Sequence, residues 1–117
     1  MQTPDWTEEF PAAITVCDEH GKVLSMNRAA AEVFAKDGGR GLVGRSLLDC
    51  HPEPARSLLA DLLAHPRSHT YTIEKGKVRK LVHQAPWRRG GRFAGFVELS
   101  VVLPPDMAHH VRKEKKT

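Results

Sequence analysis

Cysteine is scarce in this chain, which has only Cys17 and Cys50 among its 117 residues. Two cysteines at this separation form neither a disulfide framework nor a Cys-x-x-Cys metal motif, so we expect free thiols in a reducing compartment. No apolar run approaches the roughly 18–20 residues of a membrane span. Asp5, Glu8 and Glu9 stand where a signal peptide would be apolar. These absences predict a cytoplasmic protein with no membrane contact.

Recognisable catalytic motifs are also missing. We find no glycine-rich phosphate loop, no serine-centred nucleophile elbow and no paired carboxylates at a catalytic spacing. Asp49 and Glu53 flank His51 and could form a histidine–carboxylate pair, but such a pair needs a nucleophile or a metal before it can do chemistry. We therefore predict that the chain is not an enzyme.

The formal net charge of +4 is mild, and the positive charge is concentrated in two places. Lys75–Arg92 contains seven basic residues and no acidic one, and Arg112–Lys116 is mostly basic. A solvated sheet face and a basic tail are the favoured interpretation, and a nucleic-acid surface is the alternative. Trp87 is the only aromatic residue among the basic residues of the first region, which argues against a stacking platform for single strands.

A chain of this length typically forms one domain with a real core. Residues alternate between apolar and polar over Ala13–Asp18, which predicts a short strand, and Lys22–Met26 is expected to be a second short strand joined to it by a tight turn. Asn27 is a typical N-cap residue, so we expect a helix over Arg28–Lys36. The glycine pair Gly38-Gly39 ends that helix.

The stretch Gly44–Leu63 is the centre of the chain, and Asp49-Cys50-His51 places a carboxylate, a thiol and an imidazole side by side. Apolar side chains then recur with the period of a helix, at Ala55, Leu58, Leu59, Leu62 and Leu63. Pro52 suits the first position of that helix, where its missing N–H has no partner to lose. His51 therefore lies near the edge of the apolar stripe, where it either caps the helix or holds a ligand.

The remaining sequence has the period of strands over His69–Lys75, Val78–Ala85 and Arg92–Leu103, with a turn at Pro86–Gly91. We expect three parts in the chain: an N-terminal segment over residues 1–11, a folded domain over 12–104 and a basic tail or linker over 105–117. Trp6 and Phe10, four residues apart, could form one helical turn that docks on the domain or on a second copy. A loosely packed terminus is the alternative.

The order of these elements resembles the PAS sensor domain over about Pro11–Leu103. PAAITVCDEHGKVLSMNRAAAEVF is similar to the PAS opening, GLVGRSLLDC to its glycine-containing connector, and GRFAGFVELSVVL to its final strand. The resemblance implies an α+β fold, a five-stranded antiparallel sheet with short helices packed on one face. It also implies a ligand-sensing signalling domain whose partners are a second copy and a downstream signalling protein or domain.

The stretch GRSLLDCHPEPARSLLADLL is similar to a PAS subgroup with His-Pro before its long helix. Members occur in hemerythrin-associated PAS proteins and in haem-containing, carbon-monoxide-responsive regulators, where this histidine ligates haem iron. The resemblance therefore implies haem b bound through His51 for gas or redox sensing. A later methionine supplies the second ligand in those relatives, but no Met lies between Met26 and Met107 here. The iron would be five-coordinate or would take a different second residue.

A haem site needs a neutral imidazole beside an apolar pocket with room for a flat macrocycle. The residues expected to bind the cofactor are His51, as the metal ligand, and Leu58, Leu59, Leu62, Leu81, Val97 and Leu99. Ile14 and Val16 are further lining candidates, and Arg45, Arg79 or His83 could reach the propionates. The alternative function is a cofactor-free PAS module for dimerisation or protein interaction, with a filled core.

Two further residues have competing interpretations. Cys50 could be a reactive thiol, because helix N-termini lower thiol pKa values, or a small buried hydrophobic residue, which we favour. With His51 it supplies too few ligands for a structural zinc site. His83 would face the pocket if that face of its strand does, and we favour a satisfied core histidine over a ligand.

Overall fold

The computed structural model describes residues 4–115. Its strands are β1 (Ala13–Cys17), β2 (Val23–Met26), β3 (His69–Lys75), β4 (Val78–Arg89) and β5 (Arg92–Leu103). Its helices are α1 (Arg28–Val33), α2 (Leu47–Cys50) and α3 (Ala55–Ala64), with short 3₁₀ turns η1 (Ala35–Asp37) and η2 (Gly39–Leu42).

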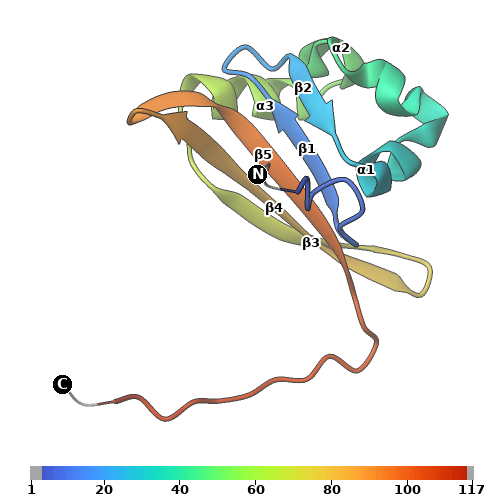
Figure 1. The fold of residues 1–117 in the computed structure, drawn as a ribbon, viewed down its shortest axis with the longest axis vertical. Coiled ribbons are helices and arrows are strands. Elements are labelled where there is room, and N and C mark those ends of the chain that lie inside the picture. Colours follow the sequence, from blue (N-terminus) through green and yellow to red (C-terminus); the bar gives the residue numbers. More distant parts are fainter. Residues whose placement is uncertain (1–3, 116–117) are drawn as a thin grey trace.

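The strands form one antiparallel sheet in the order β2-β1-β5-β4-β3. The helices lie on one face of this sheet, which we call the inner face (Figure 1). The fold class expected from the sequence is confirmed. Because β5 lies between β1 and β4, the last strand of the fold joins its first hairpin to its second.

Asn27 joins the start of the chain to the first helix. Its Oδ1 accepts hydrogen bonds from the backbone N–H groups of Ala30, at 3.0 Å, and Ile14, at 2.9 Å. Its Nδ2 donates to the carbonyl oxygens of Thr7, at 2.9 Å, and Ala12, at 2.8 Å. The side chain is only 5% exposed, and these bonds satisfy it. The predicted N-cap is confirmed, and the same amide also fixes the segment before β1.

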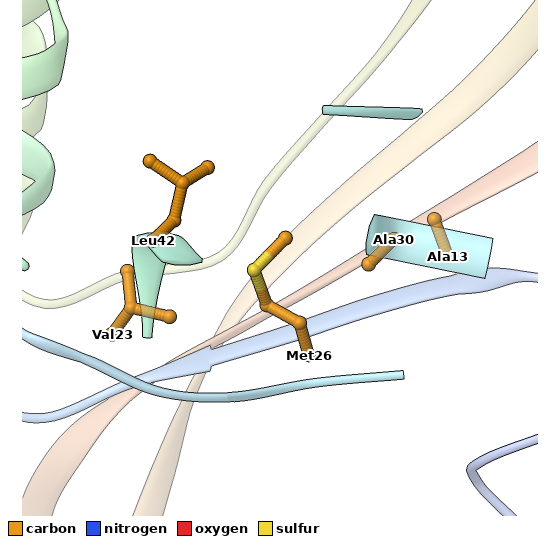
Figure 2. Close-up of a cluster of buried hydrophobic side chains, with 5 residues drawn as sticks. All are labelled: Ala13, Val23, Met26, Ala30 and Leu42. Carbon is orange, nitrogen blue, oxygen red and sulfur yellow. The ribbon is translucent and has the colours of Figure 1, made fainter. Parts of the chain in front are cut away.

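Two apolar clusters fasten the helices to the inner face. The first consists of Ala13, Val23, Met26, Ala30 and Leu42. Figure 2 shows the Met26 side chain between Leu42 and Val23 on one side and Ala30 and Ala13 on the other. The second consists of Cys17, Leu62 and Phe96 and attaches α3 to β1 and β5. The two clusters together hold α1, η2 and α3 against the sheet.

Helix α3 begins at Ala55, three residues later than the sequence predicted. The prediction placed Pro52 at its first position, but a second proline follows at Pro54. A residue before proline is disfavoured in the helical conformation, so a helix that starts at Pro52 would hold Glu53 in an unfavourable conformation. Pro54 becomes the residue that precedes the helix. His51 consequently lies at the end of α2 instead of at the start of α3.

Strand β4 is longer than predicted and passes through Pro86 to Arg89. β3 pairs with β4 only as far as Gln84, opposite His69. Beyond that point β4 pairs with β5 alone, so one edge of the strand is free. Proline is tolerated in strands at such edges, and the predicted turn shrinks to the glycines between β4 and β5.

The segments at either end differ in how they contact the domain. Trp6 and Phe10 pack edge to face with ring centroids 5.4 Å apart, and both remain exposed. Ion pairs join Glu8 to Arg40 and Glu9 to Arg28, so the segment before β1 is held against the helical layer. The tail after Leu103 extends away from the domain (Figure 1). In the described part of the chain, every helix is too short or too polar to cross a membrane.

Candidate functional site

Two adjoining cavities of about 380 Å³ and about 500 Å³ lie between the helices and the inner face of the sheet. Ligand pockets typically measure roughly 300–1,000 Å³, so each is large enough for a small molecule. We call the pair the hollow. The residues that line both cavities are Phe34, His51, Leu59, Leu62, Gln84 and Glu98.

His51 lines both cavities from the end of α2. Its Nδ1 lies 2.7 Å from the carbonyl oxygen of Leu47. A carbonyl oxygen can only accept, so Nδ1 carries a hydrogen, and in the neutral imidazole Nε2 is then the nitrogen with the free lone pair. Histidines that ligate metals commonly hold their other ring nitrogen in this way. The local geometry therefore fixes the tautomer that a metal ligand requires.

The leucines of α3 form the helical side of the hollow. Leu62 is 4% exposed, Leu59 is half-buried, and Leu58 is 48% exposed and lines only the larger cavity. The helix is anchored at Leu62, while its first turns stand over open space. The structure thus brings together four of the seven expected site residues: His51, Leu58, Leu59 and Leu62.

The other three, Leu81, Val97 and Leu99, lie on the opposite face of the sheet. Val82 pairs with Ser100 across β4 and β5, and both line the hollow, so the alternating neighbours point away from it. Neither cavity includes Leu81, Val97 or Leu99. The expectation that they line the pocket is corrected, because the helices cover the more polar face of the sheet.

Gln84 and Glu98 occupy the centre of the sheet side of the hollow. They are direct partners across β4 and β5, and Gln84 Nε2 donates to Glu98 Oε2 at 2.7 Å. The pKa of the Tyr71 hydroxyl is raised, first by burial and then by the negative charge of Glu98. Sequence reasoning missed this polar pair. The sequence feature that could have revealed the pair is the presence of Gln84 and Glu98 in the middle of two strands whose other central residues are mostly apolar.

The family model described as the PAS fold matches residues 7–103. This chain belongs to the PAS family. Among solved structures it is similar to the PAS domain of BvgS from Bordetella pertussis, with 18% identity, a TM-score of 0.62, and coverage of 84% of this chain and 81% of that one. No curated protein sequence matches the chain.

Two further PAS structures are similar at comparable levels. The PAS domain of the histidine kinase ThkA shares 18% identity at a TM-score of 0.59, covering 77% of this chain and 97% of that one. The Aer2 receptor from Vibrio cholerae, described as a dual PAS-heme oxygen sensor, shares 20% identity at a TM-score of 0.57, covering 80% and 95%. At these identities the similarity shows the fold alone.

The structure also places the three cations suggested for the propionates. Arg45 lines the smaller cavity of this PAS domain. Arg79 and His83 lie on the outer face, where Arg79 pairs with Glu74 at 3.5 Å and His83 Nδ1 lies 2.7 Å from the Thr70 hydroxyl. Ile14 and Val16 are on that outer face too, paired with Leu99 and Val97. Only Arg45 remains in place to reach a ligand.

The two thiols of the PAS domain lie in different environments. Cys17 is 2% exposed, and burial is the main cause that raises its thiol pKa. Cys50 is exposed at the mouth of the smaller cavity. The expectation of a buried Cys50 is wrong, because α2 is a single turn that presents its last residue outward.

Proposed function

We propose that this PAS domain senses a small, largely apolar molecule that binds in the hollow and passes its state to a downstream signalling protein or domain. The observation that carries the proposal is the open space between the α3 leucines and the sheet. Its polar groups are His51 on the helical side and the Gln84–Glu98 pair on the sheet. Pockets of this construction, apolar with a few placed polar groups, are typical of ligand sites.

Haem b, bound through His51 for gas or redox sensing, is the specific ligand that we propose. The fixed tautomer of His51, with Nε2 free beside the hollow, suits an axial ligand. Within residues 4–115, no three His, Cys, Asp or Glu side chains converge on one point. Haem needs only one protein ligand, so that finding is compatible with it. When bound, haem supplies an iron centre that takes up a diatomic gas or an electron.

Several residues of this chain would hold the haem. His51 provides the imidazole, and Leu58, Leu59 and Leu62 provide the apolar wall that excludes water. Of the three cations suggested from the sequence, Arg45 lines the hollow and could reach a propionate; Lys80 lines the larger cavity as well. The Aer2 receptor supports the proposal in one respect: it is described as a dual PAS-heme oxygen sensor, so a PAS protein of similar fold carries haem.

An absorption spectrum tests the haem proposal directly. The purified protein with added haem should show a sharp Soret band, and His51→Ala should abolish or shift it. His20→Ala is the matched control, because His20 lies in the β1–β2 turn with its side chain 83% exposed. Protein that takes up no haem would sink the cofactor, and an unchanged spectrum in His51→Ala would sink this histidine as the ligand.

A cofactor-free dimerisation module is the second candidate, and the outer face of the sheet favours it. The apolar side chains on that face that remain at least partly exposed are Val16, Leu81, Ala85, Val97, Leu99, Val101 and Leu103. No described helix lies on it (Figure 1). A contiguous apolar surface of this kind marks interaction sites, and a second copy would bring an identical surface to meet it.

Sedimentation velocity can test the dimer. Val101→Glu adds a charge to the outer face, and we expect it to produce monomers. Val102→Glu is the matched control, since Val102 is the next residue, points to the inner side and is 59% exposed. A wild-type protein that is monomeric, or a dimer indifferent to Val101→Glu, would contradict this candidate.

A further inference from the structure

We propose that Gln84 and Glu98 form an acceptor site that selects ligands with an N–H donor edge, such as an amidine, and excludes ligands that present a carboxylate. The inference rests on the proposed function only in requiring the hollow to be a ligand site. It does not require the ligand to be haem. It assigns a specificity role to two residues that neither the fold family nor the His-Pro stretch pointed to.

The direction of the hydrogen bond between Gln84 and Glu98 determines which acceptors and donors the pair presents to a ligand. A carboxylate can only accept, so the group that Gln84 turns toward Glu98 is its NH₂, at 2.7 Å. The carbonyl oxygen Oε1 of Gln84 is then left as an acceptor. Glu98 has a second oxygen and further lone pairs beyond the bond from Gln84. The pair therefore offers a ligand more acceptors than donors, because only the second N–H of Gln84 remains as a donor.

These free oxygens open onto the hollow. Among residues 4–115, every fully buried side-chain nitrogen and oxygen has a hydrogen-bond partner. The remaining oxygens of Gln84 and Glu98 make no side-chain hydrogen bond in the same part of the chain, so they are in contact with open space. Both residues are half-buried and line both cavities. The open space that they contact is the hollow.

The chain does not neutralise Glu98. Within the described residues the carboxylate takes part in no ion pair. Lys80 is on the same face of β4, but Val82 lies between it and Gln84 along that face. The raised pKa of Tyr71 is a second sign that the charge of Glu98 acts within the site. A ligand that carries a positive charge could therefore pair with Glu98, which has no ion-pair partner among the described residues.

This arrangement distinguishes ligands by their polar end. A flat group between the α3 leucines and the sheet would take the polar pair out of water, which is costly unless donors replace the lost solvent. An amidine or protonated amine does so with charge-assisted hydrogen bonds, the stronger kind. A carboxylate would be repelled by the charge of Glu98. The same repulsion would turn haem propionates away from Glu98, toward Arg45 at the smaller cavity or Lys80 at the larger one.

The test compares three probes of nearly the same shape: benzamidine, benzoate and toluene. Binding is followed by ¹H–¹⁵N chemical shifts of residues around the hollow. We expect benzamidine to bind at least about tenfold more tightly than benzoate. Glu98→Gln, which keeps the side-chain shape and can still bond to Gln84, should remove most of that preference. Glu74→Gln, on the outer face, should not.

The outcomes separate the two proposals. If toluene shifts the hollow residues but benzoate binds as well as benzamidine, or if Glu98→Gln leaves the preference intact, the acceptor site is refuted and the hollow remains a ligand site. If none of the three probes shifts these residues, the ligand-sensing proposal fails as well. A preference for benzamidine that Glu74→Gln removes equally would assign the effect to general surface charge and also refute the site.

Discussion

Gly95 of β5 lies against the backbone of Cys17 so closely that a Cβ atom on it would be 1.9 Å from the Cys17 carbonyl oxygen. Its φ of +149° also lies in a region that L side chains rarely adopt. Both obstacles are backbone, so no rotamer change relieves them. We expect Gly95→Ala to lower the free energy of unfolding by roughly 3 kcal/mol or more, measured by urea denaturation.

Gly90 provides the control for this variant. Its φ is +57°, but an added Cβ would meet nothing within 4 Å. Gly90→Ala should therefore cost only the strain of the left-handed conformation, about 1 kcal/mol. Equal losses for the two variants would show that conformation matters and the close approach to Cys17 does not.

Replacement of Asn27 by Ala should be costly for a different reason. The change removes the cap of α1, leaves the buried carbonyl oxygen of Ala12 without its Asn27 donor and takes the acceptor from the N–H of Ile14. The carbonyl oxygen of Thr7 also loses a bond but keeps the one from the N–H of Phe10. We expect a loss of about 2–4 kcal/mol in urea denaturation. Ser46→Ala, which removes a single bond to the N–H of Leu48 at 3.2 Å, should cost about 1 kcal/mol. Similar losses for both would mean that Asn27 acts as a cap only.

Asn27→Asp should make stability depend on pH. The variant keeps the acceptor for Ile14 and Ala30 but turns an oxygen toward the carbonyls of Thr7 and Ala12. Burial and these carbonyls raise the folded-state pKa of the new carboxyl above its usual value of about 3.9. The protonated form can donate to a carbonyl. Its contribution is therefore fully present below the unfolded-state pKa and is lost as pH rises through the folded-state pKa. The deficit against wild type should be larger at pH 7 than at pH 4.

The two cysteines should react very differently in the folded protein. Cys50 is exposed, whereas Cys17 is buried and has a raised thiol pKa. A disulfide reagent should therefore label one thiol rapidly under native conditions and the second only after denaturation. Cys50→Ser should abolish the rapid phase, and Cys17→Ser should leave it. Rapid labelling that survives in Cys50→Ser would show that Cys17 is accessible.

Asp61, on the exposed side of α3, should titrate below its ordinary range. Arg67 donates to its carboxylate at 2.7 Å, and His65 Nδ1 lies 3.2 Å from it; these contacts lower the Asp61 pKa. The folded-state pKa is depressed, so its stabilising contribution is present above the unfolded-state pKa and is lost as pH falls through the folded-state pKa. In an NMR titration of the side-chain carboxyl, Arg67→Gln should raise this pKa, and Arg56→Gln on the same helix should not.

Strand periodicity predicted the bounds of β3 and β5, but it could not say which side of the sheet the helices cover. Glu98 and Leu99 are neighbours on β5 and must face opposite sides. A burial argument assigns the helices to the side of Leu99, because apolar residues are usually the ones inside. In the structure the helices cover the side of Glu98 and leave a hollow there. The sequence therefore predicted only part of the site. The helical period identified His51 and the leucines of α3 correctly, but the residues predicted from the strands lie on the wrong face of the sheet.

The start of α3 was predicted three residues too early because each proline was considered separately. Pro52 and Pro54 are both acceptable at the beginning of a helix when each is considered alone. The effect of Pro54 on Glu53 decides between them, because it excludes a helix that includes both. Local rules of this kind place His51 correctly once they are applied together.

Strand β5 carries Glu98 in the wall of the hollow and ends five residues later at Leu103, where the tail begins. At about 3.3 Å per residue, roughly 17 Å of extended chain separates the two points. Its first part is clamped between β1 and β4, and no turn interrupts it. The second half of β5 thus connects the hollow directly to the start of the tail. A ligand that shifts the backbone at Glu98 would therefore also shift Leu103, where the tail begins, because a continuous strand joins the two residues.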